Sequence, residues 1–368
     1  MKRIIIVLLL FICGQVHSQD YRKVKTLFKH SKKIKNIATC EACFATSSHD
    51  KSVIVWNYNG KKIFKHKLNN GKIDALAFIP NSNCLLIAVT EKKGKSERSI
   101  LKNFDINGNL VKEFIDSDLT QSHVDSVFIQ NNSSVQKAQI YSANTFPSLN
   151  ISTNLNIPQA KYGLSHIERV QNISISPNTE LIATIDYFRT IKIWDLKGNI
   201  TNAFQINNNK KNTKVYFTSD STLFVTPNMI LNINSMGLQT IGNYEAYMSV
   251  PLKGKLYCYF DYNELSESEK IVDIMSDDIQ TVDSKNKYSI RTSVSNEYFA
   301  NLGIDGLIRL RDKNGKLITQ LGKDRTETIT FRGKQVPLYS NICEVGISPN
   351  SEYIISGTEK GKITIWKK

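Results

Sequence analysis

All three tryptophans of this 368-residue chain stand at the same place in the same kind of segment. The segments are 52–57 (SVIVWN), 190–195 (TIKIWD) and 362–367 (KITIWK). Each has apolar residues at alternate positions before the tryptophan, which is typical of a buried β-strand. Unrelated strands would have no reason to share this placement. The chain is therefore expected to be built from a repeated structural unit.

Two other short patterns recur with the tryptophan segments. In the first, Asn or Asp is followed by two variable residues and a glycine, which supplies the positive φ that a hairpin turn requires. In the second, a Pro-Asn pair begins a turn between two apolar strands. The turn glycines are Gly60, Gly108, Gly198 and Gly315, and the Pro-Asn pairs begin at Pro80, Pro177 and Pro349.

The patterns combine into one unit: strand a, Pro-Asn turn, strand b, loop, strand c ending in tryptophan, glycine turn, strand d. The spacing of the units averages about 44 residues, close to the length of a four-stranded propeller blade. The sequence therefore predicts an all-β propeller with eight blades, and seven blades is the alternative. The expected starts of strand a are Ile34, Ile73, Val124, Val170, Lys214, Tyr247, Lys287 and Ile342.

The two ends of the chain complement each other. The last unit stops at Lys368, directly after its strand c, and so lacks a strand d. The segment 21–28 is a strand that precedes the first strand a and has no partner of its own. We expect this N-terminal strand to join the C-terminal blade and close the ring, because closure removes open sheet edges.

The repeat resembles the WD-repeat (WD-40) family, whose blades carry Gly-His near the start and Trp-Asp near the end. The resemblance extends over the whole chain after its first twenty residues, although the repeats are degenerate. It implies a hydrogen-bonded network in which a loop His, a hydroxyl (here Thr46 or Ser48), a turn Asp and the Trp make each blade rigid. The positions that match are His30, Asp50, Trp56, His166, Trp194, Asp195, Asp305 and Trp366.

Several repeats depart from the family pattern. Phe188 and Lys360 stand where two blades would carry the turn Asp, and Arg311 occupies a tryptophan position. These blades would therefore rely on apolar packing more than on the polar network. The resemblance implies a structural role for the matching residues. It also implies a protein that binds partners and does not catalyse a reaction.

The N-terminus has the layout of a secretory signal peptide. Lys2 and Arg3 precede an apolar run over 4–13, which is too short to cross a bilayer, and Ser18 offers a cleavage site. We expect residues 1–18 to be the signal peptide and residues 19–368 to form one propeller domain.

Export follows from this signal, to the periplasm, the envelope or the extracellular space. Acylation of Cys13 in a lipoprotein is an alternative to cleavage at Ser18. No later apolar run reaches the length of a transmembrane helix, so no transmembrane anchoring is expected.

Motifs for catalysis, cofactors or metals are not evident. The chain has no Gly-x-Ser-x-Gly, no His-Glu-x-x-His and no complete phosphate loop. We therefore expect no enzyme activity, no cofactor and no metal. A propeller enzyme or ligand sensor with a site in the central channel remains the alternative, because such sites are assembled from loops of different blades.

Cys40 and Cys43 form the one close cysteine pair. A zinc site would require a second pair, and a thioredoxin-like site would require a βαβ unit. We expect two small core residues at a strand turn, and a disulfide between them remains open.

The chain carries a formal net charge of +15. A basic protein attracts acidic partners. The loops that emerge on one face of the propeller carry many of the cations, and we expect that face to bind one or more proteins with an acidic surface. Charge-driven binding of a glycan or another polyanion is the alternative, and nucleic acid is not expected. The residues proposed for partner binding are Lys92, Lys93, Lys95, Lys211, Arg325 and Arg332.

Overall fold

The structure is a computed structural model. It describes residues 21–93, 96–114, 126–129, 138–141, 169–206, 213–226, 229–235, 237–240, 246–252, 255–260, 269–273, 279–282, 289–303, 305–322, 328–331, 334–337 and 342–368. These residues form β-strands and the turns between them, and they contain no helix. The all-β class predicted from the repeats is confirmed.

Six sheets have four strands each, and we call them blades. The first blade contains β2 (Ile34–Thr39), β3 (Cys43–Ser48), β4 (Ser52–Asn57) and β5 (Lys62–Lys67). The second contains β6 (Lys72–Phe78), β7 (Cys84–Lys93), β8 (Ser96–Asp105) and β9 (Leu110–Phe114). The last combines β30 (Ile342–Ile347), β31 (Tyr353–Thr358) and β32 (Lys362–Lys367) with β1 (Arg22–Phe28).

The other three blades lie between these in sequence. One contains β16 (Val215–Ser219), β17 (Thr222–Val225), β18 (Met229–Asn232) and β19 (Gly237–Thr240). The next contains β20 (Ala246–Leu252), β21 (Lys255–Phe260), β22 (Glu269–Asp273) and β23 (Ile279–Val282). The third contains β24 (Ser289–Val294), β25 (Tyr298–Gly303), β26 (Ile308–Asp312) and β27 (Leu317–Leu321). A separate hairpin consists of β28 (Thr328–Phe331) and β29 (Lys334–Pro337).

One sheet has six strands. Four of them, β12 (Val170–Ile175), β13 (Leu181–Asp186), β14 (Thr190–Asp195) and β15 (Ile200–Ile206), follow one another in antiparallel order. The short strands β10 (Ser126–Ile129) and β11 (Ala138–Tyr141) extend this sheet, because β10 pairs in parallel with β15.

The number of blades differs from the prediction. Among the described residues, the regular four-stranded blades number six, in place of the predicted eight or the alternative of seven, and the seventh sheet is the six-stranded one. The expected blade that begins near Val124 falls mostly on residues outside the described part of the chain. In that part of the chain the described strands β10 and β11 join the six-stranded sheet and form no blade of their own. The other expected starts of strand a lie within two residues of the first residue of an inner strand.

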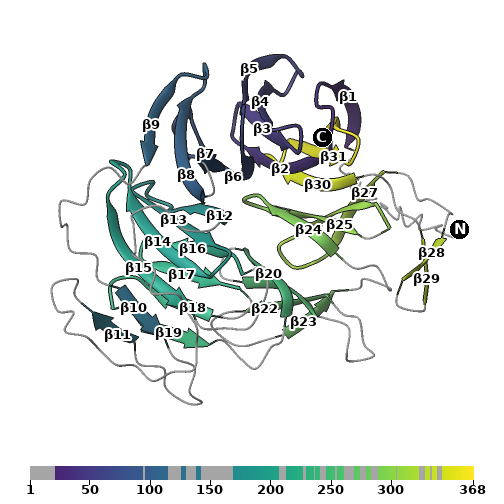
Figure 1. The fold of residues 1–368 in the computed structure, drawn as a ribbon. Helices are drawn as coiled ribbons and strands as arrows, with labels where there is room; N and C mark the ends of the chain where they lie inside the picture. Colours follow the sequence, from purple (N-terminus) through teal and green to yellow (C-terminus); the bar gives the residue numbers. More distant parts are fainter. Residues whose placement is uncertain are drawn as a thin grey trace, which may run out of the picture.

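The sheets are arranged around a common centre, with the strands β2, β6, β12, β16, β20, β24 and β30 nearest to it (Figure 1). Successive inner strands contact one another, from β2 to β6, then through β12, β16, β20 and β24 to β30, and β30 contacts β2. The predicted pairing of the two chain ends is present, because β1 runs antiparallel to β32 and is the outer strand of the last blade.

The core lies between neighbouring blades. Val53 and Val55 on β4 pack toward the second blade, whereas Ile54 and Trp56 on the same strand pack toward the last blade. Successive side chains of a strand point to opposite faces of its sheet. A strand between two neighbours therefore buries both faces, which explains why β4 is apolar at four consecutive positions.

Several inner strands carry a β-bulge near their first residue. In β2 the register shifts between Ile34 and Asn36, and in β6 it shifts between Ile73 and Ala75. A bulge leaves one residue outside the regular pairing and redirects its side chain. The bulged residues in these two strands are Lys35 and Asp74, which are the first members of the site described next.

Candidate functional site

Three sheets bring charged side chains together at the beginnings of their inner strands. The Asp74 carboxylate of β6 receives Lys35 Nζ of β2 at 2.7 Å. Arg169, directly before β12, donates to the same carboxylate oxygen through Nε at 2.9 Å and Nη2 at 2.8 Å. The Asp74 side chain is only 2% exposed. Because charge-assisted hydrogen bonds are stronger than neutral ones, this carboxylate fixes the position of both cations.

The other contacts of this cluster complete its hydrogen bonding. The Thr90 hydroxyl on β7 donates to the second oxygen of Asp74. Lys35 Nζ also donates to the Ile73 carbonyl at 2.6 Å, and Asn36 donates to the Asp74 carbonyl at 3.1 Å. Burial lowers the pKa of Lys35, although Asp74 opposes this effect. Two cations share one carboxylate, so the cluster retains a net positive charge.

His49, in the turn between β3 and β4, lies within the electrostatic influence of the cations in this cluster. Its pKa is lowered first by burial and then by four cations, Lys35, Lys33, Arg169 and Lys32. His49 is nevertheless an exposed residue, and its amide donates to the Lys33 carbonyl at 2.9 Å. Cations from two sheets therefore act on one exposed position.

Two exposed aromatic residues extend this region. Tyr187 and Phe188, in the turn between β13 and β14, are 57% and 50% exposed, and their ring centroids lie 6.2 Å apart. The Tyr187 amide donates to the Arg169 carbonyl at 3.0 Å, which places the pair beside the charged cluster. We call the set Lys33, Lys35, His49, Arg169, Tyr187 and Phe188 the basic-aromatic surface.

The first blade contains the polar network that the family pattern implies. His30 Nδ1 lies 3.0 Å from Asp50 Oδ2, and His30 Nε2 lies 2.9 Å from Thr46 Oγ1. Trp56 Nε1 donates to the same Thr46 oxygen at 3.0 Å. Thr46 therefore supplies the hydroxyl, whereas Ser48 donates to the Lys32 carbonyl at 2.9 Å.

The surroundings of His30 and Asp50 shift their pKa values and so determine which atoms of this network carry protons. Burial lowers the pKa of His30, and the effect of Asp50 opposes this only in part. Burial alone would raise the pKa of Asp50, but hydrogen bonds from Ser52 and Ser31 and the contact with His30 lower it to about 2. At neutral pH a neutral His30 donates through Nδ1 to Asp50 and accepts the Thr46 hydroxyl at Nε2.

The other matching positions show parts of the network. Trp194 donates to Thr184 at 2.8 Å, and Trp366 donates to Ser356 at 3.3 Å. Asp195 accepts the amide of Asn199 at 2.8 Å and caps its own turn.

The β24–β27 blade uses a charge pair in place of the network. Asp305 pairs with Arg309. Arg311, in the tryptophan position, donates to the Gly315 carbonyl at 2.9 Å. Both arginines are buried in this blade.

The residues proposed for partner binding are not placed by the structure. Lys95, Lys211, Arg325 and Arg332 lie outside the described residues, as does His166 of the repeat pattern. Lys92 and Lys93 belong to β7, but their side chains are also outside the described part.

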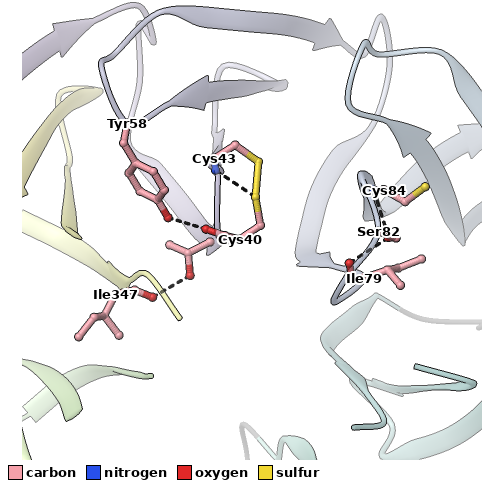
Figure 2. The surroundings of a disulfide bond; sticks show 8 residues. Cys40, Cys43, Tyr58, Ile79, Ser82, Cys84 and Ile347 are labelled. Carbon is pink, nitrogen blue, oxygen red and sulfur yellow. Dashed lines mark hydrogen bonds between the residues drawn. A yellow bond between two sulfur atoms is a disulfide. The ribbon is translucent and has the colours of Figure 1, made fainter. Parts of the chain in front are cut away.

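Cys40 and Cys43 are joined by a disulfide, with Cα atoms 5.2 Å apart (Figure 2). The sequence favoured two small core residues and left a disulfide open. In the described part of the chain, no three His, Cys, Asp or Glu side chains gather as a metal site would require.

No member of the basic-aromatic surface is among the residues that the sequence assigned to partner binding. Phe188 was noticed only as the residue that replaces an expected Asp. Lys35 and Asp74 occupy the same bulge position in successive repeats, which is the signal that could have found them. The contact with Arg169 carries no such signal, because 95 residues separate it from Asp74.

Comparison of the sequence with known protein families agrees with the observed arrangement of the sheets. The family model of the WD domain, G-beta repeat, matches residues 21–57 and 326–367. These matches and the arrangement of the blades support a WD-repeat β-propeller. Such propellers generally act as scaffolds for protein interactions and are typically not catalysts. No curated protein matches the chain. Within the described residues, no helix has the length and apolar character needed to span a bilayer.

Proposed function

We propose that this WD-repeat propeller is a non-catalytic scaffold that binds an acidic protein through the basic-aromatic surface. The observation that carries the proposal is the pair of cations, Lys35 and Arg169, that Asp74 holds beside an exposed pair of aromatic rings. Aromatic and arginine side chains are enriched at the centres of protein interfaces. An acidic surface would meet a positive potential there.

The cations are also held in place before a partner arrives. Lys35 and Arg169 are positioned by the buried Asp74, and binding would not need to order them. Fixing side chains in advance reduces the entropic cost of association. Arg169 nevertheless remains 43% exposed, which leaves its outer face available to a partner.

We further propose that the scaffold belongs to an exported assembly. The charged and apolar N-terminal segment supports export, as does the cysteine pair, because disulfides persist mainly in oxidising compartments. This part of the proposal is tested by the N-terminal sequence and location of the mature protein.

The binding role is tested by crosslinking and affinity capture from cells that make the protein. The test variants are Lys33→Glu, His49→Glu and Tyr187→Ser. The matched controls are Lys61→Glu and Lys197→Glu, which reverse exposed charges in the turns at the other end of the blades. We expect the test variants to lose an acidic partner that the controls retain. Equal capture by both groups would refute the proposal.

A charge-driven glycan or polyanion ligand is the second candidate, because exposed aromatic rings accompany the cations. Binding of heparin oligosaccharides and of poly-glutamate is compared over a range of salt concentrations. A protein site predicts that both probes bind weakly and that Tyr187→Ser affects only capture of the protein partner. Tight heparin binding that is lost in Tyr187→Ser would favour the glycan.

A further inference from the structure

The turn that contains the disulfide is short and well hydrogen-bonded. It connects β2 to β3 in the first blade, at the opposite end of β2 from Lys35. The Cys40 amide donates to the Cys43 carbonyl at 2.8 Å, and the Cys43 amide donates to Cys40 Sγ at 3.1 Å. The Tyr58 hydroxyl donates to the Cys40 carbonyl at 2.8 Å. Figure 2 shows both donors directed at Cys40.

The same turn occurs elsewhere in the molecule without a disulfide. In the β24–β27 blade, the Ser295 amide donates to the Tyr298 carbonyl at 2.9 Å, and the Tyr298 amide donates to Ser295 Oγ at 3.1 Å. Ser295 therefore supplies the acceptor that Cys40 supplies in the first blade. The turn requires an acceptor at this position, but it does not require a covalent bond.

A structural role for the disulfide is also weak on entropic grounds. The stabilisation from a crosslink decreases as the loop becomes shorter, and this loop joins residues only three apart. The strands on either side are already paired, without interruption from Asn36 to Thr39 on β2. Another role for the bond is therefore the more economical explanation.

The two cysteines differ in their exposure. Cys43 is 2% exposed and begins a buried strand, whereas Cys40 is half-buried and is followed by the exposed residues Glu41 and Ala42. An incoming thiolate would reach Cys40 first. Once reduced, Cys40 would keep the amide of Cys43 as a hydrogen-bond donor, and such a donor stabilises a thiolate.

We propose that Cys40 and Cys43 form an exchangeable disulfide that oxidises a dithiol of a partner protein. A partner thiolate attacks Cys40 Sγ, the Cys40–Cys43 bond breaks, and Cys43 leaves as a thiolate that takes up a proton. The second partner thiolate then attacks the partner sulfur of the mixed disulfide and releases Cys40. Two electrons and two protons pass to the pair, and the partner gains a disulfide.

This redox role does not depend on the proposed scaffold function, because the basic-aromatic surface lies at the other end of the inner strands. The redox role requires a partner other than the acidic protein proposed for the basic-aromatic surface. The partner must carry two thiols that approach the turn between β2 and β3, whereas an acidic partner would bind near His49.

The first experiment uses the full chain and dithiothreitol as the dithiol. Native protein is equilibrated with mixtures of reduced and oxidised dithiothreitol, and the 40–43 peptide is quantified by alkylation and mass spectrometry. Cys343 reports unfolding in the same sample, because it is buried and burial raises its thiol pKa to about 12. We expect Cys40 and Cys43 to be reduced reversibly while Cys343 stays unlabelled. Reduction only together with Cys343 labelling would overturn the proposal.

The second experiment identifies the attacked sulfur. Cys43→Ala retains Cys40, and Cys40→Ser retains Cys43 while reproducing the acceptor of the Ser295 turn. With oxidised glutathione, we expect Cys43→Ala to form its mixed disulfide at least about tenfold faster than Cys40→Ser, because exchange requires access to the thiol. Equal rates, or no mixed disulfide in Cys43→Ala, would contradict the proposed order of attack.

Discussion

Thr46 is a single hydroxyl that satisfies two buried partners in the first blade. It accepts from Trp56 Nε1 and lies within hydrogen-bond distance of His30 Nε2. All three side chains are buried. Such a residue stabilises the folded state mainly because it leaves no buried polar group without a partner. A buried donor or acceptor that lacks a hydrogen bond destabilises the fold by more free energy than one formed hydrogen bond contributes.

Replacement of this hydroxyl tests its role. Thr46→Val keeps the shape of the side chain but leaves the partner atoms of His30 and Trp56 unpaired. We expect it to lower the free energy of unfolding by about 2–4 kcal/mol in urea titrations. Ser356→Ala is the control, since it removes one longer bond to Trp366, and we expect about 1 kcal/mol. Equal losses in the two variants would contradict the assigned role.

The buried histidines also predict a pH dependence. The pKa of His30 is lowered below 6.5, chiefly by burial, and that of His66 is lowered in the same direction. The unfolded chain then binds protons that the folded chain does not, so stability falls as the pH drops below about 6.5. Asp50, with its pKa lowered from 3.8 to about 2, adds a further loss between these two values.

The measurement is the melting temperature of the wild type and of His30→Gln between pH 7.5 and 5. We expect the wild type to lose stability over this range and the variant to show a shallower slope, whatever its absolute stability. An unchanged slope would mean that His30 binds protons equally in the folded and unfolded states, which would contradict a lowered pKa.

At the scale of elements, the pairing of β1 with β32 has a clear physical consequence. Without β1, the edge of β32 would expose its backbone donors and acceptors, and open edges promote association. We expect deletion of residues 1–28 to lower the melting temperature and to produce dimers or aggregates. A chain lacking only residues 1–20 is the matched control. Gel filtration with light scattering distinguishes the two, and a monomeric, equally stable deletion would show that β1 is dispensable.

The inner strands are the elements whose positions could be predicted from the sequence. Their starts follow from apolar alternation and turn residues, so Ile34, Val170 and Ile342 begin strands as predicted. The expected start at Val124 lies outside the described residues, and the strands that follow it, β10 and β11, belong to the six-stranded sheet. The pairing of β10 with β15 is a contact between distant segments, and no local pattern encodes it.

The candidate site was less predictable for a related reason. His30, Asp50 and Trp56 lie in one blade at fixed spacing, so a repeat pattern can assign them. Lys35 and Arg169 come from different sheets, and they meet only because bulges and the arrangement of the inner strands direct them to Asp74. A count of lysines along the loops therefore identified a basic face without identifying the residues that gather on it.

At the scale of the whole molecule, Asp74 connects three sheets through one carboxylate. Its partners come from β2, from β7 and from the residue before β12. A propeller is stabilised largely by contacts between neighbouring sheets, so loss of a shared contact can reduce cooperativity as well as stability. Asp305 and Arg309 provide a comparison, because this buried pair lies within a single blade.

Asp74→Asn and Asp305→Asn therefore have different expected effects. Asp305→Asn leaves the buried Arg309 without its full partner, and Asp74→Asn does the same to the partly buried Lys35. We expect each to lower the free energy of unfolding by about 3–5 kcal/mol. Asp74→Asn is also expected to lower the denaturant m-value, because the first sheets would unfold apart from the others, whereas Asp305→Asn should leave the m-value unchanged. Urea titrations followed by both tryptophan fluorescence and circular dichroism provide the measurement. Coincident transitions with the wild-type m-value in Asp74→Asn would show that the carboxylate stabilises the sheets without coupling them.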